Sequence, residues 1–224
     1  LPKTAQPSIG RFVEVYDELG KNGDSVISIQ MMRSISGTVD AARQAADITE
    51  TNVTVVDSDF TSRSMGMIVK EAAKAAQEGK TVEEILEIVE DAKKRTTLYL
   101  TVVNLDNLIK GGRISQVMGM FSNLLNIKLF LQVINGKIEI IQKGRGLKSL
   151  QKKYDEIFEQ MKATPNGIQE IGIMHAGLSD FNEGNIARVR DLFPDVPLTI
   201  VTTSPIIMSH TGVDAMAITY LENK

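Results

Sequence analysis

Two hydroxyl side chains flank a glycine in Ser36-Gly37-Thr38, and residues of these types can hold an anion. The trio follows the apolar run Val26–Ile29 and precedes alanines at helical spacing, which predicts a strand, a tight turn and a helix. The first turn of a helix offers unpaired backbone N–H groups and the positive end of the helix dipole, which together suit a carboxylate. The alternative is an ordinary N-cap that binds no ligand.

Both histidines of the chain follow apolar runs that are typical of strands, Ile171–Met174 before His175 and Ile206–Met208 shortly before His210. A histidine at the end of a strand is commonly a hydrogen-bonded structural group. His210 carries a further signal, because the glycine of Thr211-Gly212 lets backbone approach a ligand closely. An imidazole can donate a hydrogen bond to a carboxylate in either charge state, so His210 is a second candidate for an anion site.

Asp57-Ser58 stands at the carboxyl end of a second predicted strand, Val53–Val56. Ligands of open α/β sheets gather beyond the carboxyl ends of the strands, so we expect Ser36 and Ser58 to approach the same crevice. Asp57 is also a suitable helix cap, which would give it a structural role instead.

Arg113 and Arg145 each stand beside glycine, which exposes backbone and leaves the guanidinium free to reach outward. A functional arginine here would meet a carboxylate or a phosphate with two parallel hydrogen bonds. The alternative is a solvated surface side chain.

The motifs of common enzyme classes are absent from the sequence, including the nucleophile elbow, the zinc-protease helix, the phosphate-binding loop and the dinucleotide fingerprint. Ser36 and His210 could serve as nucleophile and base, although no acid that would orient the histidine is identifiable from spacing. Two distant histidines and no cysteine form a poor ligand set, so neither a metal nor a cofactor is expected.

The composition of the 224-residue chain, with 42% hydrophobic and 24% charged residues, is that of a soluble globular protein large enough for two lobes. There is no apolar stretch of about 18 residues and no signal-peptide pattern. The lack of cysteine is in keeping with a reducing cytoplasm, where we expect the protein to reside. A net charge of −3 gives no general attraction to nucleic acid.

Strand and helix patterns alternate over the first hundred residues, which predicts an α/β lobe with a mostly parallel sheet at 1–97. Thr81 and Glu84 are spaced as a capping box at the start of one of its helices. The chain opens at Leu1 into a proline-rich loop without a leading strand, so we expect an upstream strand segment to be missing.

The pattern changes in the second predicted lobe, 98–224, where Asn135-Gly136 between two apolar runs is a strong hairpin signal near 127–142. A hairpin after βαβ units predicts a mixed sheet. The turn at Gly111-Gly112 is expected to lead into another helix. The remaining predicted elements are strands at Leu98–Val103, Ile168–Met174, Leu198–Thr202 and Ala215–Tyr220, and helices at Leu105–Ile109, Leu147–Met161 and around Ile186–Leu192.

Seven short motifs, in order and spread from residue 2 to about 220, resemble the DegV family. Each is a weak signal alone, whereas the ordered set is specific. The motifs are Thr4-Ala5-Gln6-Pro7-Ser8, Ser36-Gly37-Thr38, Asp57-Ser58, Gly111-Gly112-Arg113-Ile114-Ser115, Leu125-Asn126-Ile127-Lys128, Lys143-Gly144-Arg145 and His210-Thr211-Gly212.

The resemblance implies a two-lobed α/β protein that binds one long-chain fatty acid, with the carboxylate in the crevice between the lobes. It also implies a partner, a separate fatty acid kinase that phosphorylates the bound carboxylate and so supplies acyl phosphate to phospholipid synthesis. Contact with a membrane would be only peripheral or transient. The chain itself would then be a lipid-binding subunit and not an enzyme.

The family motifs also imply roles for individual residues. The residues that would lie at the carboxylate are Thr4 and Ser36, with Gly37, Thr38 and His210. Those that would close or orient the crevice are Arg113, Ser58 and Thr211. Arg145 would face the kinase. The sequence departs from the family pattern at three places: Ala5 removes a hydroxyl, Met32 and Arg33 replace serines, and Val213-Asp214 replaces Pro-Gly. The alternatives are a self-contained acyl hydrolase or kinase-like enzyme using Ser36 or His210, and a lipid sensor.

Overall fold

The computed structural model describes residues 2–113 and 127–224, which form two compact units. The N-terminal unit contains Ala5–Lys94 together with Asn135–Lys137, and the C-terminal unit contains the chain up to Thr4 and the remaining described residues. Because each unit draws on more than one stretch of chain, this grouping defines no single boundary. The predicted boundary between residues 97 and 98 therefore stays a prediction, as does the upstream strand.

The N-terminal unit has two parallel strands, whose paired residues run from Val26↔Val53 to Gln30↔Asp57. The predicted capping box is present, because Thr81 N donates to Glu84 Oε2 at 2.8 Å and Glu84 N donates to Thr81 Oγ1 at 3.3 Å. The elements of this unit are α1 (Ile9–Gly20), β1 (Val26–Gln30), α2 (Thr38–Ala46), β2 (Val53–Asp57), α3 (Ser62–Gln77) and α4 (Val82–Arg95).

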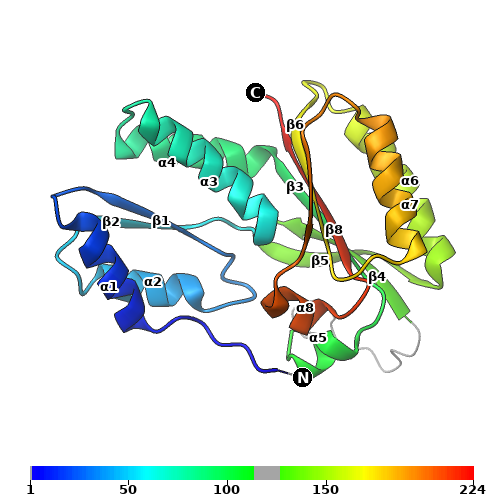
Figure 1. Ribbon diagram of the computed structural model, residues 1–224, viewed down its shortest axis with the longest axis horizontal. Coiled ribbons are helices and arrows are strands. Elements are labelled where there is room, and N and C mark those ends of the chain that lie inside the picture. Colours follow the sequence, from blue (N-terminus) through cyan, green and yellow to red (C-terminus); the bar gives the residue numbers. More distant parts are fainter. Residues whose placement is uncertain (1, 114–126) are drawn as a thin grey trace. The chain divides into compact units, whose positions relative to one another are not determined.

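The C-terminal unit is built on a six-stranded mixed sheet of order β5-β4-β3-β8-β6-β7, in which β6 and β7 are the parallel pair (Figure 1). The α/β class and the mixed second sheet are as predicted. The elements are β3 (Thr96–Val102), α5 (Asp106–Lys110), β4 (Ile127–Ile134), β5 (Lys137–Arg145), α6 (Leu147–Lys162), β6 (Ile168–His175), α7 (Asp180–Leu192), β7 (Leu198–Thr202), α8 (Pro205–Thr211) and β8 (Met216–Glu222).

The hairpin between β4 and β5 turns at Asn135 and Gly136, whose φ angles are 50° and 69°. Both lie in the left-handed region that asparagine and glycine tolerate best, which explains why this dipeptide predicts the turn correctly. The helix expected after Gly111-Gly112, with Ile114-Ser115 and Leu125-Asn126 of the family motifs, lies outside the described residues.

Helices α6 and α7 cover one face of the large sheet (Figure 1). The buried residues of α6 recur at helical spacing, Leu150, Tyr154, Ile157, Phe158 and Met161, and pack on sheet residues such as Ile171 and Ile218. Tyr154 is fully buried, which raises the pKa of its phenol strongly, and its hydroxyl lies 3.0 Å from Thr101 Oγ1.

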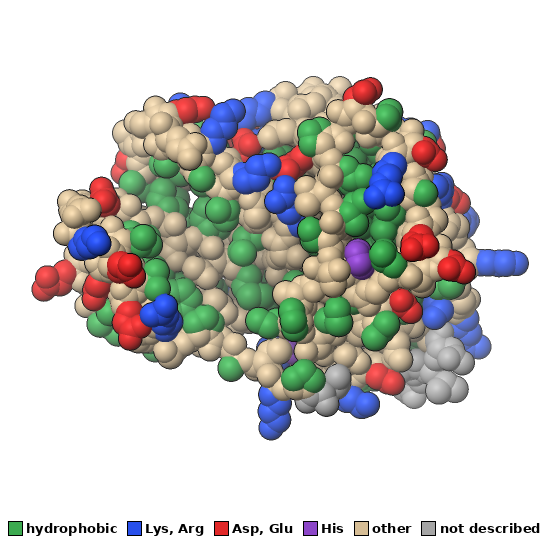
Figure 2. Space-filling view, in the orientation of Figure 1, with side chains coloured by type: hydrophobic (Ala, Val, Ile, Leu, Met, Phe, Trp, Pro, Cys, Tyr) green, Lys and Arg blue, Asp and Glu red, His purple; other side chains and the backbone are tan. Residues whose placement is uncertain are grey.

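On the face shown in Figure 2, acidic and basic side chains are interspersed.

The strand expected at Ile206–Met208 is wrong, because these residues lie in helix α8. Ser204 caps the helix by accepting a hydrogen bond from Ile207 N at 3.4 Å. Pro205 occupies the first turn, where its missing N–H costs nothing. A short apolar run fits either a strand or a helix, so Ser204 and Pro205 decide that this segment is helical.

Within the described ranges, none of the helices is both long and apolar enough to cross a bilayer.

Removing the aromatic ring of Phe158 tests the packing of α6 on the sheet. Phe158 is fully buried, so Phe158→Ala should lower the free energy of unfolding by about 3–5 kcal/mol, measured by urea denaturation. Leu147→Ala on the same helix is the control, because Leu147 is 42% exposed and should cost about 0.5 kcal/mol or less. Equal effects of the two substitutions would contradict this packing.

Candidate functional site

The C-terminal unit brings Thr4 and His210 together, although 206 positions separate them in sequence. Thr4 Oγ1 and His210 Nε2 share a hydrogen bond of 2.8 Å, and both residues are half-buried. His210 lies in the last turn of α8, so the orientation of that short helix decides where the imidazole points.

The imidazole of His210 lies against Gly111, which ends the turn after α5. A Cβ at position 111 would lie 2.4 Å from His210 Nδ1 and 2.9 Å from the backbone oxygen of Asn107, so only glycine fits there. His210 Nδ1 is buried and finds no hydrogen-bond partner among the described residues. A buried ring nitrogen of this kind is available to a ligand or to water.

The environment of His210 favours its neutral form. Burial lowers the pKa of His210, and the positive charge of Arg113 lowers it further. Arg113 is itself held near the histidine, because its Nη1 donates to Gly111 O at 3.0 Å. A carboxylate at this cluster would therefore meet a hydroxyl, an imidazole and a guanidinium, which are three groups that can donate hydrogen bonds.

The N-terminal unit holds the second predicted group, Ser36, Gly37 and Thr38, at the start of α2. Ser36 Oγ lies 2.7 Å from Thr38 Oγ1 and accepts from Thr38 N at 3.3 Å. Gly37 is the N-cap residue and makes no side-chain cap bond. Ser36 thus supports the turn that begins the helix, and its predicted contact with a carboxylate stays a prediction.

Two further residues near this turn were not predicted as site residues. Ser34 Oγ is buried and has no hydrogen-bond partner within the described chain. The side-chain oxygen of Gln6 lies over Gly37, where it would be 2.3 Å from a Cβ. Long-range placement of this kind cannot be read from local spacing.

Asp57 and Ser58 build a turn at the end of β2. Ser58 is fully buried, and its hydroxyl donates to Phe60 O at 3.1 Å and accepts from Phe60 N at 3.2 Å. The Asp57 carboxylate accepts hydrogen bonds from Arg33 N and Asp59 N. It therefore stabilises this loop and does not cap a helix. The predicted place of Ser58 beside a ligand stays a prediction.

The remaining predicted residues, Thr211 and Arg145, belong to the C-terminal unit. Thr211 is buried, and its hydroxyl donates to Ile207 O at 3.1 Å within α8. Arg145 is exposed at the end of β5. Within the described ranges, no group of three or more His, Asp or Glu residues is arranged to hold a metal ion.

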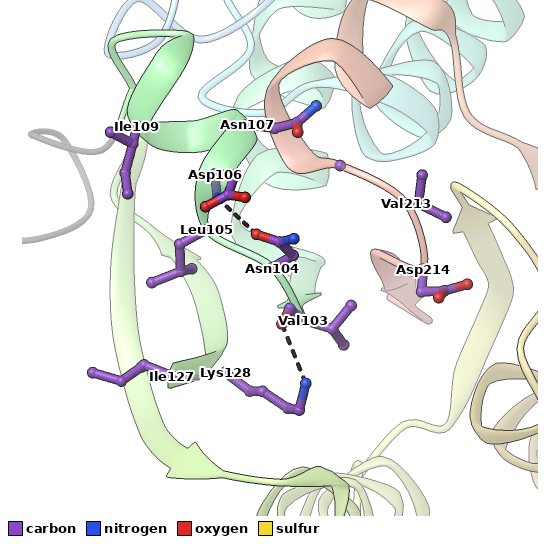
Figure 3. Close-up of a pocket in the computed structure, with 11 residues that line it drawn as sticks. Val103, Asn104, Leu105, Asp106, Asn107, Ile109, Ile127, Lys128, Val213 and Asp214 are labelled. Carbon is purple, nitrogen blue, oxygen red and sulfur yellow. Dashed lines mark hydrogen bonds between the residues drawn. The ribbon is translucent and has the colours of Figure 1, made fainter. Parts of the chain in front are cut away.

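A cavity of about 700 Å³ opens between α5, the start of β4 and the segment that follows α8 (Figure 3). Its apolar lining comes from Val103, Leu105, Ile109, Ile127 and Val213. Its polar lining comes from Asn104, Asp106, Asn107, Lys128 and Asp214, of which Lys128 Nζ donates to Val103 O at 3.2 Å. The cavity shares α5 with the Gly111 and Asn107 contacts, so it lies beside the elements that hold His210.

The fold is that of a two-unit α/β protein. The family model described as "Uncharacterised protein, DegV family" matches residues 1–223, and the chain belongs to the DegV family. A DegV domain-containing protein of Streptococcus pneumoniae is 42% identical over 97% of this chain and 77% of its own length.

Solved structures agree with this family assignment. The crystal structure of DegV, a fatty acid binding protein from Bacillus subtilis, is 28% identical with a TM-score of 0.87, covering 99% of this chain and 79% of that one. A structure describing fatty acid binding of a DegV family protein from Thermus thermophilus is 30% identical with a TM-score of 0.83, covering 100% of this chain and 80% of that one. The resemblance and the fold class inferred from the sequence are therefore confirmed.

The lowered pKa of His210 gives a pH dependence with a definite sign. Below the ordinary value of 6.5, the unfolded chain binds more protons at this residue than the folded chain does. We expect the unligated protein to lose stability as the pH falls from about 7.5 to about 5.5, and His210→Gln to flatten this slope. Urea midpoints of the wild type and of His210→Gln across this pH range measure the two slopes. A His210→Gln slope equal to that of the wild type would contradict the prediction.

Proposed function

We propose that this chain binds one long-chain fatty acid and receives its carboxylate at the cluster of Thr4, His210 and Arg113. The observation that carries the proposal is the Thr4–His210 hydrogen bond, which leaves the buried Nδ1 of the histidine unpaired. Relatives with the same fold from Bacillus subtilis and Thermus thermophilus are described as binding fatty acids, which supports the same ligand here.

The chemistry of these side chains suits a carboxylate that leaves water. An ionised carboxylate buried without partners costs several kcal/mol, so hydrogen-bond donors must replace its hydration. Thr4 and neutral His210 have two donor hydrogens between them, of which one is used in their mutual hydrogen bond and one is left for the carboxylate. Arg113 supplies several donors together with a positive charge. Ser36, Gly37 and Thr38 are proposed as a further group of donors for the same carboxylate.

The acyl tail is proposed to lie along the apolar side of the cavity beside α5, which Leu105, Ile109 and Ile127 line. A volume of about 700 Å³ falls within the usual range for a small-molecule site. Burying a sixteen-carbon tail at about 0.8 kcal/mol per methylene supplies roughly 10 kcal/mol, from which the cost of ordering the tail is subtracted. The tail therefore supplies most of the affinity, and the donors fix the orientation.

Mass spectrometry of the purified protein, first native and then after organic extraction, tests the proposed ligand. A near-stoichiometric fatty acid in the extract supports the proposal and identifies the tail. A protein that is empty, and that also fails to bind added fatty acids, would overturn it. Hydrolysis of an acyl ester that is abolished by Ser36→Ala would favour the enzyme alternative instead.

The Thr4 hydroxyl is tested by a substitution that keeps the shape of the side chain. Thr4→Val removes one hydrogen bond to the carboxylate and should weaken fatty acid binding about tenfold, whereas Thr4→Ser should bind almost as the wild type. Isothermal titration calorimetry with a long-chain fatty acid measures the affinity of both variants. Equal loss in the two variants would show that the methyl group and not the hydroxyl is important.

The proposal extends to the next step, in which a fatty acid kinase phosphorylates the carboxylate presented by this chain for phospholipid synthesis. Phosphoryl transfer from ATP requires loops that position the nucleotide and Mg²⁺, and the sequence carries no phosphate-binding loop. A separate kinase supplies this chemistry in the proposal. The exposed Arg145, beside Lys143 and Lys148, is proposed to face it. Because the kinase and its ATP are cytoplasmic, the proposal places the chain there too.

Reversing the charge of Arg145 separates ligand binding from presentation. Arg145→Glu should leave fatty acid affinity unchanged and lower acyl phosphate formation at least tenfold when a fatty acid kinase and ATP are added. The acyl phosphate is trapped with hydroxylamine and counted. Arg190→Glu makes the same charge change at an exposed position of α7 and should leave both measurements unchanged. Loss of fatty acid affinity in Arg145→Glu would contradict the proposed surface.

A further inference from the structure

Asn107 links α5 to the helix that carries His210. Its Nδ2 donates to the backbone oxygens of Met208 at 3.4 Å and Ser209 at 3.2 Å, which lie in α8. Met208 O also accepts from Gly212 N at 2.9 Å, so the carboxamide meets its second lone pair. Ser209 O lies in the last turn, where helix carbonyls commonly take partners from outside the helix. One carboxamide therefore holds the backbone on the residue directly before His210.

The backbone of Asn107 contributes to the same arrangement. Asn107 O accepts from Gly111 N at 2.8 Å, and this bond places the glycine on which the imidazole lies. Gly212, which ends α8 with a φ of 78°, lies next to the Asn107 side chain, because a Cβ there would be in ordinary van der Waals contact with Asn107 Cγ at 3.5 Å. Asn107 thus touches the elements on two sides of the histidine.

The chemistry of the Asn107 side chain is specific. A carboxamide nitrogen has two hydrogens, which equals the number of carbonyl oxygens it meets. Aspartate has nearly the same shape but has no donor, and it would place a negative charge against two carbonyl dipoles. A purely space-filling role would tolerate aspartate, whereas a donor role would not.

We propose that Asn107 is a positioning residue for His210, acting through the backbone of α8. This inference rests on the proposed function for its consequence, which is that loosening α8 weakens carboxylate binding. Its structural part concerns only the orientation of His210 and is measurable in the protein without ligand.

Histidine NMR tests the proposal, because the chain has only two histidines and each gives one Cε1–Hε1 signal. His175→Gln assigns the pair. Asn107→Ala and Asn107→Asp should move the His210 signal and shift the His210 titration toward the ordinary pKa, whereas the His175 signal should stay in place. Both variants should also bind fatty acid about tenfold more weakly. The serine side chain in Asn107→Ser is too short to reach both carbonyls, so this variant should give the same changes as the alanine and aspartate variants. It is the substitute if either of those does not fold.

Asn223→Ala is the matched control. Asn223 Nδ2 also donates to a backbone oxygen, that of Asn166 at 2.8 Å, at the end of β8. Its loss should alter neither His210 nor fatty acid binding. An unchanged His210 signal in the folded Asn107 variants would overturn the proposal. A His210 signal that moves in a protein whose wild type binds no fatty acid would uphold the positioning role and overturn the proposed function.

Discussion

The hydrogen bond between Thr4 and His210 is the interaction on which the candidate site depends. It fixes the segment around Thr4 against α8, and it engages Nε2 of the imidazole so that only Nδ1 is left unpaired. Burial and the charge of Arg113 lower the pKa of His210 and so favour the neutral ring, in which Nδ1 and Nε2 together carry one proton. The histidine can therefore donate in one direction and accept in the other, which suits a carboxylate held beside a hydroxyl.

Two short helices carry the residues that position His210, and specific contacts join these helices. Helices α5 and α8 have five and seven residues, too few to be stable alone. Asn107 and Gly111 join the two helices directly, whereas the extensive core under α6 and α7 stabilises the sheet from which they extend. Leu105 and Leu108, at α5, also pack in a smaller core cluster with Val102, Leu129 and Leu131, so α5 is itself anchored on the sheet.

Local signals in the sequence were sufficient for most of the fold. Asn135-Gly136 predicted its hairpin and Thr81 with Glu84 predicted a capping box, because in each case the deciding contacts lie within a few residues. Helix α8 was missed because Ile206–Met208 fits either a strand or a helix, and the cap at Ser204 decided between them. The pairing of Thr4 with His210 joins distant segments, so no periodicity could reveal it, and only the ordered family motifs pointed to both residues.

Ser36 and Ser58 follow strands in the same way in the sequence, but they differ in burial and in hydrogen-bond partners in the structure. Each is a serine after a strand of the small parallel sheet. Ser58 is fully buried, and both its hydroxyl contacts are used on Phe60. Ser36 is only half-buried and shares its hydroxyl with Thr38 at the start of α2, where the helix dipole adds a preference for negative charge. Burial and hydrogen-bond partners, which depend on the tertiary fold, therefore favour Ser36 over Ser58 as a ligand group.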